Sequence, residues 1–393
     1  MVIQNTLLRR PRLRVGIVGG GFMAEVHCRA ARAAGAEVVG VASSTRASAE
    51  RAAQRFDIPS AYASVEELLV DGSVDLVHVC TPNASHAAIT MAALEADKHV
   101  VCEKPLATDP ETAASLLRLA AERKRIATVP FVYRFHPMVR EARARVGAGD
   151  LGPLITVQGS YLQDWLLNTS DDNWRVDAEV GGASRAFADI GSHLCDLVEF
   201  VAGERISGLC AQTRTIFADR KNTKCITTED VAALLFRTAN GLLGTFMISQ
   251  VAPGRKNRLS FEINGRAQSL FFDQEAPETL WVGGKAASQI ITRSPEGLHA
   301  DAARLALVPA GHPQGYQDAF NGFVADTYAA VAGDVPDGLP DFADGLRAAA
   351  LTAAVLTSAR DGAWVSVPDL FLPPDTPGRS HPLTAQQPLT TSD

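Results

Sequence analysis

Three side chains that could together assist the oxidation of an alcohol lie in two distant stretches of the chain. Lys104 belongs to CEKP, which closes the apolar run HVVC, and Asp189 and His193 stand four residues apart in GGASRAFADIGSHLCDL. A neutral histidine can accept a hydroxyl proton near neutral pH, and a lysine ammonium can stabilise the alkoxide that forms. The carbon-bound hydrogen would leave as a hydride, so this chemistry also requires a nicotinamide cofactor.

A glycine-rich turn near the start of the chain could supply the cofactor site. Gly19, Gly21 and Ala24 form G-x-G-x-x-A after the apolar run RVGIV and before a helical pattern. Gly19 permits a tight turn, and Gly21 lets the backbone approach a pyrophosphate. Phe22 and Met23 follow as the first residues of the helix, whose N-terminus faces the anion. The pattern predicts dinucleotide binding.

The end of the second apolar run bears on which dinucleotide is bound. Sites for NAD usually offer Asp or Glu there to hold the ribose hydroxyls, whereas VVGVASSTR offers Ser43, Ser44 and Arg46. No carboxylate would repel the 2′-phosphate of NADP, and Arg46 could either pair with that phosphate or point to solvent. These residues alone favour NADP or the use of both dinucleotides.

Asp189 and His193 have alternatives to a catalytic role. If a helix begins near Asp189, the two side chains project from one face and could form a structural hydrogen bond or ligate a metal. No other cluster of His or Cys in the sequence completes a coordination shell. We therefore expect no metal.

The elements that must position these residues change character along the chain. From residue 14 to about 129, apolar runs alternate with helical patterns over residues 23–34, 45–56, 85–96 and 110–125, and Thr108 is the expected cap of the last helix. Such alternation predicts βαβ units and a doubly wound parallel sheet, a Rossmann domain. CTPNASH (residues 80–86) and CEKP then lie at the carboxyl edge of the sheet, where ligands bind in open α/β folds.

After about residue 151 the pattern predicts an open, mostly antiparallel sheet. The strand-like runs are PLITVQGSYLQ, DVAALLFRT, LLGTFMISQV, RLSFEI, QSLFFD and ETLWVG, with Asn-Gly steps at 240–241 and 264–265 that indicate hairpins. Helical patterns cover residues 191–201, 316–332 and 342–359. The expected organisation is a flexible arm (1–13), a Rossmann domain (14–135) to which the C-terminal helix could return, a substrate-binding and oligomerisation domain (136–370) and a tail (371–393).

Composition excludes several other classes of protein. The formal charge is −7, with 37 Lys and Arg against 44 Asp and Glu, so nucleic acid is not an expected partner. The six cysteines are scattered without a CxxC motif, which favours free thiols in the cytoplasm. The leader MVIQNTLLRRPRLR contains a twin arginine, but the apolar run that follows is too short for a signal peptide, and no stretch is long enough to span a membrane.

Taken together, the motifs resemble the Gfo/Idh/MocA family of oxidoreductases from about residue 14 to 367. The resemblance implies that Lys104 is the catalytic lysine and that Asp189 and His193 are the acid and histidine of the second domain. It also implies that Trp174 and Arg175 form a pair beside the cofactor. Other residues that it places around the dinucleotide are Thr81, Pro82, Asn83, His86 and Glu103.

Within the family, TVPFVYRFHP and GSYLQDWLLNTSDDNWRVD look like the levoglucosan dehydrogenases, which oxidise an anhydrosugar at its C3 hydroxyl with NAD. In that case Tyr133 and Gln163 make polar contacts with the sugar and Trp165 stacks on it, although Tyr161 and Trp165 could simply pack on the sheet. This resemblance favours NAD over NADP and implies a homodimer or homotetramer.

Other activities remain open from the sequence. They are an NADPH-dependent reductase of a keto- or anhydro-sugar, an inositol or other polyol dehydrogenase, an oxidoreductase that keeps its cofactor tightly bound, and a non-enzymatic dinucleotide sensor. Ser43 departs from the acid common in NAD-using members, and Ala183 stands where a third glycine is common.

Overall fold

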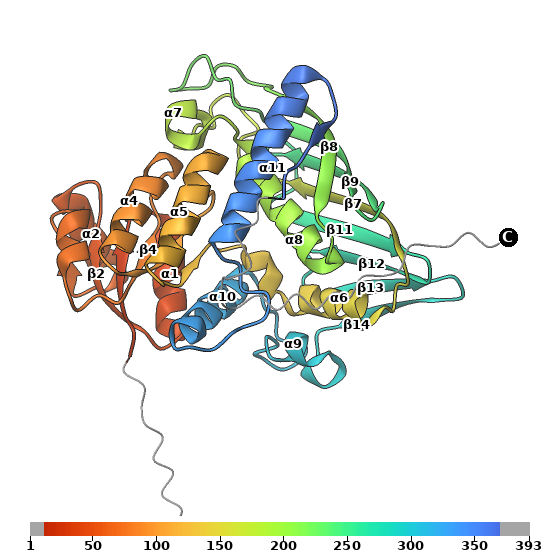
Figure 1. Cartoon of the computed structure of the whole chain (residues 1–393), viewed down its shortest axis with the longest axis horizontal. Helices are drawn as coiled ribbons and strands as arrows, with labels where there is room; N and C mark the ends of the chain where they lie inside the picture. The colour runs from red at the N-terminus through yellow and green to blue at the C-terminus, as the bar shows by residue number, and fades with distance from the viewer. Residues whose placement is uncertain (1–11, 370–393) are drawn as a thin grey trace, which may run out of the picture.

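The computed structural model describes residues 12–369, which form two β-sheets with helices around and between them (Figure 1). Most of the expected N-terminal arm and all of the expected tail lie outside the described residues. Among residues 12–369, none of the helices has the length and hydropathy that a membrane span requires.

The first sheet confirms the predicted Rossmann topology. Its six strands are all parallel, in the order β3-β2-β1-β4-β5-β6, so the strand order reverses between β1 and β4. The strands are β1 (Arg14–Val18), β2 (Glu37–Ala42), β3 (Ser60–Ala61), β4 (Leu76–Val79), β5 (His99–Cys102) and β6 (Ala127–Thr128). The helices between them are α1 (Phe22–Ala33), α2 (Arg46–Phe56), α3 (Val65–Val70), α4 (Asn83–Glu95) and α5 (Pro110–Glu122).

The expected cap of α5 was wrong by one residue. Asp109, not Thr108, is the N-cap, and its carboxylate accepts a hydrogen bond from the backbone N–H of Thr112 at 2.8 Å. Pro110 occupies the first helical position, so the residue directly before it must be the cap. The Thr side chain thus lies one residue too early to reach the free N–H groups of the helix.

The second sheet is mostly antiparallel, as predicted, with one parallel pair formed by β7 and β10. Its order is β14-β13-β12-β11-β7-β10-β9-β8-β15. The strands are β7 (Leu154–Leu162), β8 (Ile206–Arg214), β9 (Val231–Thr238), β10 (Leu243–Ser249), β11 (Arg258–Gly265), β12 (Gln268–Asp273), β13 (Thr279–Gly284), β14 (Ser288–Thr292) and β15 (Val365–Ser366). The sequence patterns missed β8, β14 and β15.

Both predicted hairpins are present, but only one turns at its Asn-Gly step. Gly241 has a φ of +93° between β9 and β10, a conformation that glycine adopts without strain. Gly265 instead ends β11, and the chain turns at Arg266 and Ala267. A Cβ on Gly265 would lie 2.3 Å from the backbone oxygen of Leu151, so glycine is needed there for close approach.

Helices of the second half connect the two sheets. The helices after β6 are α6 (Pro137–Ala148), α7 (Ala178–Gly181), α8 (Ser192–Ala202), α9 (Ala300–Ala303), α10 (Tyr316–Val331) and α11 (Phe342–Asp361). The helices α6, α8 and α11 lie on the face of the second sheet that is turned toward the first (Figure 1). In addition, α10 packs on α1 and α11 packs on α5, so the end of the chain returns to the Rossmann half. A division of the chain near residue 135 stays a prediction.

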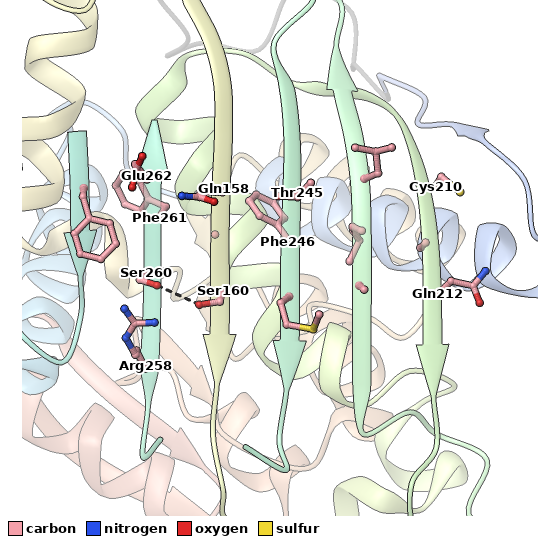
Figure 2. A pocket seen from close by; sticks show the side chains of 17 residues that line it. Gln158, Ser160, Cys210, Gln212, Thr245, Phe246, Arg258, Ser260, Phe261 and Glu262 are labelled. Atoms are coloured by element: carbon pink, nitrogen blue, oxygen red, sulfur yellow. Dashed lines mark hydrogen bonds between the residues drawn. The ribbon is translucent and has the colours of Figure 1, made fainter. Parts of the chain in front are cut away.

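The other face of the second sheet is a shallow hollow (Figure 2). Small and polar side chains such as Gln158 and Ser160 line its centre, where the hydroxyls of Ser160 and Ser260 lie 3.1 Å apart. Leu235 and Met247 on the neighbouring strands are 39% and 46% exposed. Large exposed apolar side chains on a sheet face are typical of a contact surface.

Candidate active site

An ion pair brings the two distant stretches of the sequence together. Lys104 follows β5 at the carboxyl edge of the first sheet, and its Nζ donates to Asp189 Oδ1 at 2.6 Å and to the backbone oxygen of Asp189 at 2.9 Å. Both side chains are largely buried. Burial acts to raise the pKa of Asp189, but the charges of Lys104 and Arg175 outweigh it and hold that pKa well below its usual range. Asp189 is therefore a carboxylate in this site.

Two further side chains complete the surroundings of Asp189. Arg175 Nε lies 3.5 Å from Asp189 Oδ1, and its guanidinium lies over the ring of Trp174 at 4.4 Å. Gln250 donates from Nε2 to Asp189 Oδ2 at 2.8 Å. The Trp-Arg pair was singled out from the sequence, whereas Gln250 was missed. Its only signal was its place as a polar residue near the end of the strand-like run LLGTFMISQV.

His193 lies in the first turn of α8, beside this ion pair. The chain reaches α8 through a π-helical turn at Phe187–Gly191, which contains Asp189, and the regular helix begins at Ser192, within one residue of the predicted helical pattern. The His193 ring meets the Tyr133 ring edge-on with 5.1 Å between their centroids. Asp189 bonds to Lys104 and Gln250, so the alternative of a structural Asp-His hydrogen bond is not found among the described residues, where His193 Nδ1 is buried without a partner.

The protonation state of His193 follows from its environment. Burial and the charge of Lys104 lower its pKa to about 3, although Glu103 and Asp189 act in the opposite direction. The sequence could not decide between these effects. His193 is therefore neutral at physiological pH and available to accept a proton.

The turn that carries Asp189 and His193 is held by a buried carboxylate that the sequence analysis missed. Glu229 Oε1 accepts hydrogen bonds from Ser184 Oγ at 2.7 Å, Arg185 N at 3.0 Å and Phe187 N at 2.8 Å. Three donors on one oxygen fix the backbone at the start of the turn. Glu229 precedes β9, so no local pattern connected it with residues 184–187.

The glycine-rich turn lies where the strand order of the first sheet reverses. Gly19 has a φ of +120°, and a Cβ there would lie 2.6 Å from the backbone oxygen of Cys80. Gly21 is the N-cap of α1 and has no side chain to cap it, and a Cβ there would meet no atom within 4 Å. Phe22 begins the helix 68% exposed, and Met23 follows it partly buried. The N-terminus of α1 thus has free space beside Gly21, which fits a bound pyrophosphate.

The residues after β2 are tied to α2. Ser43 Oγ lies 3.0 Å from Ser48 Oγ, and Thr45 caps α2 by accepting from the backbone of Ser48. Ser44 is exposed. Arg46 is exposed and pairs with Glu50 at 3.1 Å. A carboxylate thus already accompanies the arginine that could have attracted a 2′-phosphate.

The CTPNASH stretch supports neighbouring loops through its polar side chains. The ring nitrogens of His86 lie 2.8 Å from the backbone oxygen of Thr81 and 2.7 Å from that of Pro105, next to Lys104. Pro82 is the N-cap of α4, and Asn83 donates to the backbone oxygen of Gly181 at 2.8 Å. His86 is fully occupied by these backbone contacts, so it positions loops around the site.

Glu103 is the end of a buried chain of hydrogen bonds. It accepts from the backbone of Lys104 at 3.1 Å and bonds to His27 at 3.0 Å. The Nδ1 atoms of His27 and His78 lie 2.6 Å apart, and the His78 Nε2 atom lies 2.8 Å from the Tyr328 hydroxyl. Burial lowers the pKa of His78 well below its usual value, and although burial acts to raise the pKa of Glu103, the hydrogen bond to His27 lowers it, so His78 is neutral and Glu103 is ionised. The chain connects α10 to the residue before Lys104.

The expected substrate residues lie on the other side of His193. Tyr133 contacts the hydroxyl of Tyr161, while Gln163 is bonded to the Trp165 indole at 2.7 Å and to Asn257 at 2.7 Å. The sequence analysis missed Asn257, which precedes β11. No group of three His, Cys, Asp or Glu side chains within residues 12–369 is arranged to hold a metal ion.

Comparisons with known proteins agree with this geometry. The family profile described as "Oxidoreductase family, NAD-binding Rossmann fold" matches residues 13–131, and the "GFO/IDH/MocA C-terminal domain" matches residues 139–271. Levoglucosan dehydrogenase of Pseudarthrobacter phenanthrenivorans is 30% identical over 91% of this chain and 99% of its own length. Glucose-6-phosphate 3-dehydrogenase of Bacillus subtilis is 26% identical over 85% of this chain and 93% of its own length.

The fold is also similar to those of solved structures. A levoglucosan dehydrogenase in complex with NADH and levoglucosan superposes with a TM-score of 0.85 at 29% identity, covering 91% of this chain and 100% of the other. An inositol dehydrogenase homologue in complex with NAD⁺ from Azotobacter vinelandii has a TM-score of 0.81 at 26% identity, covering 90% and 97%.

The open space at Gly21 leads to a prediction about dinucleotide binding. Gly21→Val should fold normally, since the Cβ meets no protein atom within 4 Å, but should raise the Kd for NADH at least tenfold because the side chain fills the approach to the pyrophosphate. Fluorescence titration with NADH and thermal unfolding measure the two effects. Gly19→Ala is the comparison variant for the effect on folding. It should lower Tm, because its Cβ meets the Cys80 backbone. Normal NADH binding by Gly21→Val would show that the turn has no role in binding.

Proposed function

The chain belongs to the Gfo/Idh/MocA family of NAD-binding oxidoreductases, and on that premise we propose that it oxidises a secondary hydroxyl of an unphosphorylated sugar, with levoglucosan as the first candidate. The observation that carries the proposal is the ion pair of Lys104 with Asp189 beside neutral His193, at the edge of a Rossmann sheet. These three groups are what an alcohol oxidation needs apart from the hydride acceptor.

The dinucleotide fits the part of the site formed by the glycine-rich turn. Gly19 and Gly21 would hold its pyrophosphate at the N-terminus of α1, and Phe22, Met23, Ser43 and Ser44 would lie along it. Loops containing Thr81, Pro82, Asn83, His86, Glu103 and the Trp174–Arg175 pair would surround the nicotinamide side. When bound, NAD supplies the acceptor for the hydride.

In the proposed mechanism the chain's own residues deal with the hydroxyl proton and the charge on oxygen. The sugar hydroxyl lies between Lys104 and His193. The Lys104 ammonium, held by Asp189, donates to the oxygen as negative charge develops there. His193 accepts the proton at Nε2, since its Nδ1 is buried. Asp189 also holds a neighbouring hydroxyl and, through Gln250, keeps its orientation toward Lys104.

The charges of the site favour a neutral sugar over a sugar phosphate. Lys104 and Arg175 both lie against Asp189, and Glu103 adds a second buried carboxylate. Two cations are thus balanced by two anions, and no surplus positive charge remains for a phosphate among these groups. This supports levoglucosan, the substrate in the name of one relative, over glucose 6-phosphate, which appears in the name of another.

We propose NAD as the preferred dinucleotide over NADP. Arg46 is paired with Glu50, so it is a weak partner for a 2′-phosphate, while Ser43 and Ser44 can bond to ribose hydroxyls. The solved complex of the similar levoglucosan dehydrogenase contains NADH.

An absorbance screen for reduced nicotinamide tests this function. NAD and NADP are each combined with levoglucosan, glucose, glucose 6-phosphate, myo-inositol and 1,5-anhydroglucitol. We expect the highest kcat/KM with levoglucosan and NAD, at least tenfold above glucose 6-phosphate. A higher kcat/KM for the phosphate would contradict the charge argument, and a preference for NADP would contradict the assignment of Ser43 and Arg46. Turnover of none of these compounds would contradict the function itself.

The open face of the second sheet is the proposed contact surface for a second copy of this chain. Leu235 and Met247 are exposed there beside small side chains, which allows two flat faces to approach closely. All six cysteines are free thiols, which supports the further proposal that the protein works in the cytoplasm.

Sedimentation velocity at micromolar concentration tests the assembly. We expect the wild type to sediment as a dimer or tetramer and Met247→Asp to shift toward monomer, because it buries a charge at the contact. Val70→Asp on α3, where Val70 is 80% exposed, is the matched control and should leave the assembly unchanged. A monomeric wild type would refute the proposed contact.

A further inference from the structure

Five polar side chains form one continuous set of hydrogen bonds beside His193, which we call the Asn257 network. They come from three segments that are far apart in the sequence: η1 (Val132–Phe135), the end of β7 with the residues that follow it, and the residue before β11. The ring centroids of Tyr133 and Tyr161 lie 5.1 and 6.4 Å from that of His193. The members are Tyr133, Tyr161, Gln163, Trp165 and Asn257.

Trp165 fixes the direction of this network, because an indole N–H can donate but cannot accept. It donates to Gln163 Oε1 at 2.7 Å, so the amide nitrogen of Gln163 must face the other way. That nitrogen donates to Asn257 Oδ1 at 2.7 Å. The amide nitrogen of Asn257 therefore faces Tyr133 and donates to its hydroxyl at 3.1 Å. Both amide orientations follow from the chemistry of their partners.

The two tyrosines close a ring of three hydrogen bonds with Asn257. Tyr161 donates its hydroxyl proton to Asn257 Oδ1 at 2.8 Å. Because that is its only proton, the contact between the two phenols must use the proton of Tyr133. Burial raises the pKa of both phenols, so both keep their protons at neutral pH. Tyr133 thus donates to Tyr161, accepts from Asn257 and keeps only a lone pair.

If Tyr133 and Gln163 contact the sugar, as the family resemblance implies, the ring fixes which of the two donates to the ligand and which accepts from it. Tyr133 can accept a hydrogen bond from a ligand but has no proton to give. Gln163 has one N–H bonded to Asn257 and a second N–H that can donate. A ligand must therefore offer a hydroxyl proton to Tyr133 and an oxygen lone pair to Gln163.

We propose that Asn257 is a specificity-determining residue, which makes Tyr133 an acceptor and Gln163 a donor and so selects sugars with a free hydroxyl at one position. The proposal rests on the proposed sugar oxidation. Asn257 acts as a positioning residue, through its two neighbours. A site with a fixed acceptor rejects an analogue that lacks the matching proton, since a buried polar group is then left unpaired.

Deoxyfluoro sugars test this polarity, because fluorine is small and cannot donate a proton. We use the singly deoxyfluoro analogues of the sugar that the wild type oxidises best, each changed at a hydroxyl that is not oxidised. With fluorine at one position, the kcat/KM of the wild type should be at least tenfold lower than with the parent sugar. Fluorine at each other position should lower kcat/KM less. Quenching of NADH fluorescence by the same sugars gives their Kd for the enzyme–NADH complex as a second measurement.

Two variants should free the Tyr133 hydroxyl to donate a hydrogen bond to a ligand, each by a different change of partner. Asn257→Leu removes the acceptor of Tyr161, so Tyr161 can donate to Tyr133 instead. Tyr161→Phe removes the acceptor of Tyr133. In both, we expect the discrimination at that one position to fall to about threefold or less, while kcat for the parent sugar falls less than tenfold. Asn264→Ala, near the far end of β11, is the matched control and should keep the discrimination, since Asn264 bonds to Ser269.

The outcomes separate this inference from the proposed function. Unchanged discrimination in both active variants, or an equal loss at every position, would overturn the role of Asn257 and leave the sugar oxidation standing. A wild type that oxidises no sugar would overturn both. If both variants lose the discrimination at that one position and Asn264→Ala keeps it, the result supports the fixed directions of the hydrogen bonds in the Asn257 network.

Discussion

The ion pair between Lys104 and Asp189 is the interaction on which the arrangement of the site depends. It joins the end of β5 in the first sheet to the turn before α8, 85 residues further along the chain. Two buried charges are tolerated only when each has a partner and further polar contacts, and here Gln250 donates a hydrogen bond to Asp189 while the Arg175 guanidinium forms a second ion pair with it. The same pair places a positive charge near His193 and helps to keep that imidazole neutral. A cation for the alkoxide and a neutral acceptor for the proton thus arise from one contact.

The rest of the fold serves to hold both ends of this pair. On the first sheet, the reversal of strand order leaves the glycine-rich turn at the carboxyl edge, and the buried chain from Tyr328 to Glu103 supports the residue before Lys104. On the second half, Glu229 fixes the turn that carries Asp189. The helices α10 and α11 pack on α1 and α5 and so connect the two halves (Figure 1).

Local patterns in the sequence were sufficient for the elements and motifs, but not for contacts made across the chain. The alternation of apolar runs with helical patterns predicted the Rossmann sheet, because β1, β2, β4 and β5 are almost entirely buried. Thr108 was preferred as a cap although Pro110 required Asp109, and β8 was missed because ISGLCAQTR lacks a clear alternation. Gln250, Glu229 and Asn257 were missed for another reason. Each acts on residues more than 40 positions away, so only the folded chain shows their partners.

A double-mutant cycle on the ion pair tests the central claim most directly. Hydride transfer to NAD is measured in a single turnover at saturating sugar for wild type, Lys104→Met, Asp189→Leu and the double variant. If the two residues act as one unit, each single change should slow transfer about 10²-fold or more and the double variant should be little slower than either. Fully additive losses in the double variant would contradict the account, because the two side chains would then contribute independently.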